Sequence, residues 1–355
     1  MGKGFAITSD LDLGKMLTDG YSHNLDDTHA QHGFDKSKES SNCEKRIPSR
    51  LPRIRVAAIT NDTVATFASS AYTVKAAPNS RVAMGLIVGT GTNATVPMRA
   101  LDLHPQKRDD LANPDMVDTV VINTEWTIRG TDRPLVDLQI KTIWDESLDA
   151  SSDAPGFQPF EYMTSGRYLG EIVRLAFVDV VSRRPGVQVP ASLKNKNALQ
   201  TRFLSEVVAR MDDETIRSEL EILYPSSSVS VPFWTPVRVQ LVREIAHAVQ
   251  QRSSALIAAA CVGLLDCVHD IQMNSDMSGN RATIKDIESE ELVIAYTGST
   301  ISHYPEWLVT CQRWIDALVA SGSPANRSKR VVLREAVDGG IIGAGVLVGT
   351  TQHSD

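Results

Sequence analysis

The stretch GLIVGTGTNATVPM, residues 85–98, runs from a strand-like apolar segment into two glycines and then an asparagine. Glycine adopts a positive φ and lets another backbone approach closely, so the exposed N–H groups of such a turn can bind a phosphate. The same letters fit the dinucleotide fingerprint G-x-G-x-x-A, and they also fit an ordinary turn between two strands. The dinucleotide motif needs a helix that opens within it, whereas Pro97 and Pro105 follow here without a helical apolar face. The dinucleotide interpretation is therefore the weakest, and the turn alone leaves the other two open.

The composition describes a chain that can bury a sizeable core. Its 355 residues, 42% of them hydrophobic, exceed the usual size of a single core and predict two domains or one large divided domain. A formal net charge of −7 without a long basic run argues against a nucleic-acid partner. The cysteines, Cys43, Cys261, Cys267 and Cys311, are scattered and form no C-x-x-C pair. We therefore expect no disulfide framework, no metal site built on cysteine, and a reducing, cytoplasmic location.

We also expect no membrane span. The most apolar run, ALIAAACVGLL at residues 255–265, is too short to cross a bilayer and predicts a buried helix. The opening MGKGFAITSD lacks the apolar segment of a secretory signal. The oligomeric state is left open by the sequence.

Three apolar runs end in polar or glycine-rich residues, a pattern typical of a sheet that presents functional groups at the ends of its strands. They are IRVAAIT (54–60), VAMGLIV (82–88) and VDTVVIN (117–123). Residues 292–297 and 329–334 predict further strands.

Helical patterns follow the first strands. Apolar residues recur at spacings of three and four in residues 165–181 and 199–211, near 238–270, and in 307–318. Strands first and helices afterwards, with further strands near the end, indicate an α/β protein. Residues 22–52, by contrast, are rich in Ser, Asp, His and Lys, so we expect a surface insertion without regular structure there.

Five motifs occur in one order along the chain: VAAITNDTVATF, GLIVGTGTNA, INTEW, PGFQPFEYMTSGRYLGEIVR and EAVDGGIIGAG. Together with the opening KGF and the SDLDLGKML after it, they resemble segments of hexokinases of the fungal hexokinase and glucokinase type. The resemblance covers nearly the whole chain apart from the polar insertion. It implies an actin-like ATPase fold with mixed sheets flanked by helices, a large domain and an incomplete small domain. It also implies transfer of the γ-phosphoryl group of ATP, with Mg²⁺, to the 6-hydroxyl of a hexose such as glucose, a step that feeds glycolysis.

The resemblance implies a division of the chain as well. Residues 1–58 correspond to a remnant of the small domain that carries the polar insertion. Residues 59–337 correspond to the large domain, and residues 338–355 to an element that returns toward the small domain. The sugar is expected in the cleft between the two domains.

Asp62, in NDT, corresponds to the catalytic base of the family. A carboxylate beside the attacking hydroxyl can orient it and accept its proton as the new phosphorus–oxygen bond develops. Taken without the other motifs, NDT would be interpreted as a helix N-cap, where Asn and Asp are favoured.

Six residues match sugar-contacting positions of the family. Carboxylates accept hydroxyl hydrogens, so two of them on opposite sides of a ring can fix its orientation without reacting with it. Each residue taken alone would be interpreted as a solvated surface side chain. The six are Lys3, Asn61, Asn93, Glu125, Gln158 and Glu161.

Five further residues match the nucleotide side of the family's site. These are Gly89, Thr90, Gly91, Gly298 and Ser299. Gly339 and Gly340, which lead into a helix, resemble the closing glycine element. No separate metal-ligating residue is predicted.

The match has gaps. The family's first phosphate loop, Asp-x-Gly-Gly-Thr-Asn, and its early sugar segment have no counterpart within the chain and would lie before Met1. The aspartate of that loop helps to place Mg²⁺, so the Mg²⁺ site is expected to be incomplete. Thr297 also replaces an aspartate of the adenosine segment. A catalytically impaired, sugar-binding or regulatory relative is therefore the alternative.

Overall fold

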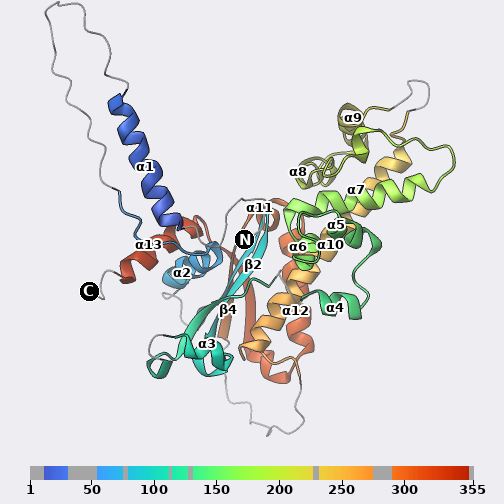
Figure 1. Cartoon of the computed structure of the whole chain (residues 1–355). Coiled ribbons are helices and arrows are strands. Elements are labelled where there is room, and N and C mark those ends of the chain that lie inside the picture. The colour runs from blue at the N-terminus through green and yellow to red at the C-terminus, as the bar shows by residue number, and fades with distance from the viewer. Residues whose placement is uncertain are drawn as a thin grey trace, which may run out of the picture. The chain divides into compact units, whose positions relative to one another are not determined.

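The computed structural model describes residues 12–30, 54–74, 79–111, 114–126, 131–226, 232–274 and 290–351 (Figure 1). The chain divides into two compact units, one of residues 1–60 with 348–355 and one of residues 61–347. Lys3 lies outside the described residues, so its predicted sugar contact stays a prediction, as do the domain boundaries at 58 and 337.

The first unit contains helix α1 (Leu13–Ala30). The Asp12 carboxylate accepts a hydrogen bond from Lys15 N at 3.0 Å, which caps the first turn. The prediction of irregular structure from residue 22 onward was wrong over residues 22–30, where the helix continues. Polar residues carry only small helix penalties, and once a helix has formed each added residue gains a backbone hydrogen bond.

Residues 54–60 form no regular structure, so the strand predicted there was wrong. Ile54 and Ile59 are exposed, and no described strand pairs with this segment. β-branched residues favour an extended chain, but a strand also requires a hydrogen-bonded neighbour.

The second unit is built on one five-stranded mixed sheet. The strands are β1 (Ser80–Val88), β2 (Thr92–Arg99), β3 (Thr119–Asn123), β4 (Glu290–Thr297) and β5 (Lys329–Glu335). Their order is β3-β2-β1-β4-β5, with β3, β2 and β1 antiparallel and with β1, β4 and β5 parallel. Four of the five strands were predicted from their apolar runs, and these predictions are confirmed.

Helices surround the sheet. The α-helices of this unit are α2 (Asp62–Val74), α3 (Pro105–Asp109), α4 (Asp132–Asp137), α5 (Ile143–Ala150), α6 (Pro159–Thr164), α7 (Gly166–Ser182), α8 (Thr201–Phe203), α9 (Asp213–Leu223), α10 (Pro236–Cys267), α11 (Ser299–His303), α12 (Trp307–Ser321) and α13 (Gly339–Thr351). Short 3₁₀ turns are η1 (Ala100–Asp102), η2 (Pro114–Met116), η3 (Ser192–Lys194) and η5 (Pro324–Ser328), and η4 (Leu204–Val208) is a π-helical turn.

The two faces of the sheet bury different partners. Met84 and Leu86 of β1 and Ile294 of β4 belong to the main core, which they share with α7, α10 and α12. Val82 and Val293 point the other way, into a small cluster that Phe67 of α2 covers. Figure 1 shows α2 on one side of the strands and α10 and α12 on the other.

α10 runs through the main core and contains the apolar run 255–265. Ile257, Ala258, Cys261 and Leu265 are buried, which confirms the predicted buried helix. The helix has 32 residues and, by length and composition alone, could span a membrane; 44% of its most apolar window is buried. The helix is longer than the apolar run because it continues on the N-terminal side of the run through the polar residues 250–254. Core helices of soluble proteins pass the same test, so this length is weak evidence for a span.

Glycine sets how closely α2 approaches the sheet. A Cβ added at Gly85 of β1 would lie 2.5 Å from the Thr63 carbonyl oxygen, a separation that real side chains do not adopt. The absent side chain therefore lets the first turn of α2 lie directly on β1. This contact sets the position of Asn61 and Asp62, at the start of the helix, relative to the strand.

Candidate active site

The glycine turn joins two antiparallel strands. β1 pairs with β2 through Ile87–Asn93 and Val88–Thr92, and Gly89 N donates to Gly91 O at 2.9 Å inside the turn. A strand rather than a helix follows the glycines, so the dinucleotide interpretation is excluded. Thr90, at the tip, is exposed.

Three segments that are far apart in sequence meet at Gly89. Its carbonyl accepts hydrogen bonds from Gly166 N at 2.7 Å and from Thr300 Oγ1 at 3.2 Å. Gly298 has a φ of +124°, and a Cβ there would lie 2.4 Å from Val88 O. The hairpin turn, the start of α7 and the β4–α11 turn therefore lie together. This arrangement brings the predicted nucleotide residues Gly89, Gly298 and Ser299 into one place.

The predicted base lies at the start of α2. Asn61 Oδ1 accepts hydrogen bonds from Thr63 N at 2.9 Å and from Thr63 Oγ1 at 2.5 Å, so Asn61 is the N-cap that the alternative interpretation anticipated. Asp62 is the first helical residue and its side chain is exposed. Thr63 Oγ1 also lies 2.6 Å from Thr95 Oγ1, which attaches this end of α2 to β2.

A group of polar side chains lies on the same face of β2 and β3. Thr95 pairs with Asn123, and successive residues of a strand alternate between faces, so Asn93, Thr95 and Asn123 share one face. Asn93 Nδ2 donates to Asn123 Oδ1 at 2.7 Å and to Glu125 Oε1 at 3.4 Å. Asn123 Nδ2 donates to Glu125 Oε1 at 3.0 Å. The predicted residues Asn61, Asn93 and Glu125 therefore belong to one neighbourhood, which also contains Asn123.

Glu161 approaches the hairpin from the helical side. It is the third residue of α6, only 1% exposed, and its Oε2 accepts a long hydrogen bond from Thr92 N at 3.5 Å. Gln158 immediately precedes α6 and is buried, and among the described residues no hydrogen bond from its side chain to another predicted site residue is seen. The end of α6 is tied to the core, because Thr164 O accepts from Ser253 Oγ at 2.9 Å.

The aromatic residues beside α6 remain uncharged at neutral pH. Burial raises the pKa of Tyr168 to about 12; nearby Arg167 lowers it, whereas Glu161 raises it further. Burial likewise raises the pKa of Tyr162, and the two rings pack edge to face at 4.9 Å. The phenol groups of Tyr162 and Tyr168 are therefore neutral neighbours of the buried Glu161 carboxylate.

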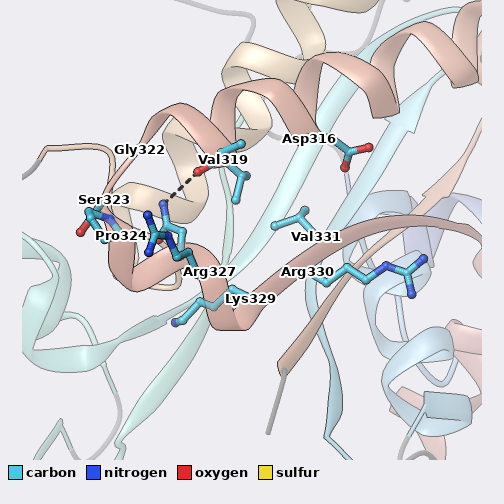
Figure 2. A pocket seen from close by; sticks show the side chains of 11 residues that line it. Asp316, Val319, Gly322, Ser323, Pro324, Arg327, Lys329, Arg330 and Val331 are labelled. Atoms are coloured by element: carbon cyan, nitrogen blue, oxygen red, sulfur yellow. Dashed lines mark hydrogen bonds between the residues drawn. The ribbon is translucent and has the colours of Figure 1, made fainter. Parts of the chain in front are cut away.

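A hollow elsewhere in this unit does not qualify as the site. It measures about 420 Å³ and is bounded by the end of α12, η5 and the start of β5. Figure 2 shows that the side chains of Arg327, Lys329 and Arg330 point in different directions around it. Two of the three are near carboxylates, Lys329 at 3.8 Å from Glu290 and Arg330 at 3.5 Å from Glu291. The hollow also lies at the beginning of β5, whereas Gly298 follows the end of the parallel strand β4.

The described residues contain no group of three or more His, Cys, Asp or Glu side chains that could hold a metal ion.

Comparison with known proteins assigns the fold and the family together. A family model described as hexokinase matches residues 83–350. The chain belongs to the hexokinase family. Its mixed sheet flanked by helices is the actin-like ATPase fold of hexokinases, as predicted, and the motifs at the hairpin, at Glu125 and at Glu161 lie within the matched residues.

Relatives from plants and from a flatworm are similar over most of this chain. It is 30% identical over 304 residues to hexokinase-1 of Nicotiana tabacum, covering 84% of this chain and 54% of that protein. It is 29% identical over 319 residues to the hexokinase of Schistosoma mansoni, covering 88% and 60%. The chain therefore spans little more than half the length of these curated relatives.

Solved hexokinase structures have the same fold. The Schistosoma mansoni hexokinase complexed with glucose aligns with a TM-score of 0.64 at 29% identity, covering 82% of this chain and 57% of that one. A second hexokinase crystal structure aligns with a TM-score of 0.60 at 24% identity, which supports the fold alone. The subtype within the family stays a prediction.

Proposed function

We propose that this protein transfers the γ-phosphoryl group of ATP to the 6-hydroxyl of a hexose such as glucose. The observation that carries the proposal is the arrangement around one hairpin. Asn93 and Glu125 lie on one face of the hairpin strands, and Glu161 reaches its backbone from the other side. Acceptor oxygens from separate elements that gather at one hairpin suit a ring that carries hydroxyl groups.

Asp62 takes the role of general base in this proposal. Its carboxylate is exposed at the first residue of α2 and has no ion-pair partner among the described residues, so it is available to a ligand hydroxyl. Asn61 and Thr63 hold the helix start in place through the bond to Thr95. A positioned base contributes roughly 100- to 10,000-fold to such a step.

The described residues fit a nucleotide phosphate. Because Gly298 has no side chain, the β4–α11 turn packs directly against the backbone of Val88 and Gly89, and the hydroxyl of Ser165 at the start of α7 is buried with no hydrogen-bond partner among the described residues. Thr90, Gly91, Gly298 and Ser299 would hold the phosphates through backbone N–H groups and hydroxyls, and Gly89, whose N–H donates to Gly91 O, would shape the turn. When bound, ATP with Mg²⁺ supplies the phosphoryl group and neutralises its charge. Mg²⁺ is commonly held by one or two carboxylates together with substrate phosphates.

The second candidate function is sugar binding without turnover. It is favoured by Thr297, which replaces an aspartate of the family's adenosine segment, and by the missing counterpart of the first phosphate loop within these 355 residues. A cytoplasmic location and a contribution to glycolysis belong to the first proposal.

Two measurements on the full chain distinguish these functions. Calorimetry with glucose measures binding, and a coupled assay with glucose and MgATP measures turnover. Binding with turnover supports the kinase, and binding without a phosphorylated product supports the second candidate. No binding at millimolar glucose contradicts both.

The assigned base has its own test. We expect Asp62→Ala to lower turnover roughly 100- to 10,000-fold while the Kd for glucose changes only a few-fold. Asp115→Ala is the matched control, because Asp115 is an exposed carboxylate in η2 away from the hairpin. Turnover that is unchanged in Asp62→Ala would remove Asp62 from this role.

A further inference from the structure

The hydrogen bonds among Asn93, Asn123 and Glu125 fix which atom of each amide is oxygen. Ala94 N is a donor, so the Asn93 atom that it contacts at 2.8 Å is Oδ1 and the other is Nδ2. Asn93 Nδ2 then donates to Asn123, whose contacting atom must be Oδ1. Asn123 is left with its Nδ2 facing Glu125, which accepts it. Every donor in the chain of bonds meets an acceptor.

These hydrogen bonds engage one carboxylate oxygen of Glu125, Oε1, and leave the other, Oε2, open. Glu125 Oε1 accepts from both amides, at 3.0 Å and 3.4 Å. Glu125 Oε2 has no partner among the described residues. Both hydrogens of Asn93 Nδ2 are engaged, so Asn93 retains only a lone pair on Oδ1. This corner therefore offers a ligand the acceptors Glu125 Oε2 and Asn93 Oδ1, together with the second N–H of Asn123 Nδ2.

The backbone at Glu125 supplies a reason for the arrangement. Its φ is +44°, in the left-handed region that non-glycine residues rarely adopt. The neighbours hold it there: Thr124 N donates to Ala94 O at 3.0 Å, and Trp126 is buried with its ring edge against Phe160. The Glu125 side chain is exposed, however, so the backbone alone leaves its rotamer free.

We propose that Asn123 is a positioning residue for the sugar site. It holds Glu125 Oε1 so that Oε2 faces the ligand, and its Oδ1 engages one of the two amide hydrogens of Asn93. The inference rests on the proposed hexose binding. In this proposal Asn123 acts through Glu125 rather than as a sugar contact.

A double-mutant cycle on the full chain tests whether Asn123 acts through Glu125. Calorimetry gives the glucose Kd of the wild type, Asn123→Ala, Glu125→Ala and the double variant. We expect Asn123→Ala to weaken binding about 10- to 100-fold, the effect of a lost bond to a charged group. In the Glu125→Ala background, which has no acceptor for the Asn123 amide, the same change should have less than a 3-fold effect.

A pH profile of Asn123→Asp gives a second readout. The new carboxyl faces Glu125 Oε1, and two carboxylates this close raise the pKa of one of them, so they share a proton at low pH. A shared proton restores the donor, and the glucose Kd should therefore improve at least 5-fold between pH 8 and pH 5.5. Thr119→Asp places the same charge on the same strand about 13 Å away and should show no such profile.

The outcomes separate the two ideas. A wild type that binds no glucose contradicts the proposed function. A wild type that binds, together with equal losses for Asn123→Ala in both backgrounds or a flat pH profile for Asn123→Asp, overturns the positioning role. Asn123 is exposed at a strand end, so both variants are expected to fold; if Asn123→Ala does not, the pH profile alone decides.

Discussion

Gly298 combines a left-handed backbone with a neighbour that leaves no room for a side chain. Its φ is +124°, and an added Cβ would lie 2.4 Å from Val88 O and 2.9 Å from Gly89 N. Gly298→Ala must therefore shift either the hairpin or the β4–α11 turn. We expect the free energy of unfolding to fall by about 1–3 kcal/mol, measured by urea denaturation.

Gly263 provides the control for this change. It lies in α10, its φ is ordinary for a helix, and an added Cβ would meet nothing within 4 Å. Gly263→Ala should leave stability unchanged or raise it by up to about 1 kcal/mol, because alanine is the better helix former. Equal urea midpoints for both variants would mean that the turn at Gly298 is not constrained.

At the scale of single residues, the motifs predicted four site residues that the structure places near the hairpin, but not how they bond. These are Asn61, Asn93, Glu125 and Glu161; Glu125 and Glu161 bond to the hairpin strands directly and Asn61 through Thr63. Asn123 was missed although it lies two residues before Glu125 in INTEW. Its role depends on the pairing of Thr95 with Asn123, and strand register cannot be deduced from one isolated motif.

Helices and strands were predicted correctly where a segment with a regular apolar pattern also packs against, or pairs with, another element of the structure. β1, β3, β4 and β5 follow apolar runs, and α7, α10 and α12 follow three-and-four spacing. The run at residues 54–60 has the same composition but forms no strand, because no described strand pairs with it. The motif SGRYLGEIVRL resembles its hexokinase counterpart partly because its residues are needed for packing. Gly170 lies against Leu199 O, and Glu171 forms a buried ion pair with Arg174 at 2.6 Å.

The cap of α9 is expected to make stability depend on acid pH. The Asp212 carboxylate accepts from Thr215 N at 2.8 Å and Glu214 N at 3.1 Å, and these backbone bonds lower its pKa below the ordinary value. A lowered pKa in the folded state gives stabilisation that is present above the unfolded pKa, about 3.9, and is lost as the pH falls through the folded value.

Asp212→Asn tests that dependence, because asparagine caps a helix about as well and does not titrate. At pH 7 the variant should unfold at nearly the same urea concentration as the wild type. Between pH 5 and pH 3 the wild type should lose more stability than the variant. Parallel losses over this range would show that the cap is not a source of acid sensitivity.

At the scale of the whole molecule, burial separates the three cysteines that the structure describes into reactive and protected sets. Burial raises the pKa of Cys261 and of Cys311, and both side chains lie in the main core, whereas Cys267 is exposed at the end of α10. Because the thiolate is the reactive form, a native sample treated with iodoacetamide at pH 8 should be alkylated at Cys267 before either core cysteine.

Peptide mass spectrometry over a urea series measures this order. Alkylation of Cys261 and Cys311 should rise at the urea concentration at which tryptophan fluorescence reports unfolding of the core. Cys267→Ser should remove the fast modification without moving that midpoint. Alkylation of all three thiols at the same rate in the native protein would contradict a single packed core around α10 and α12.

The α/β class and the family were accessible from sequence because five motifs spread over the chain each contribute independently. The division into units at residues 60 and 347 depends on contacts between distant segments, and the predicted boundaries at 58 and 337 stay a prediction.

The Gly89 carbonyl oxygen accepts two hydrogen bonds, and this has a mechanical consequence. The donors are Gly166 N and Thr300 Oγ1, so this one carbonyl is already engaged when an anion reaches the turn. A displacement of the turn by a bound anion would therefore be transmitted through these two hydrogen bonds to the first turns of α7 and α11. The hydrogen bonds of Gly89 therefore link the hairpin to both helices. A movement of the hairpin toward a ligand would have to break these bonds or move the starts of α7 and α11 with it.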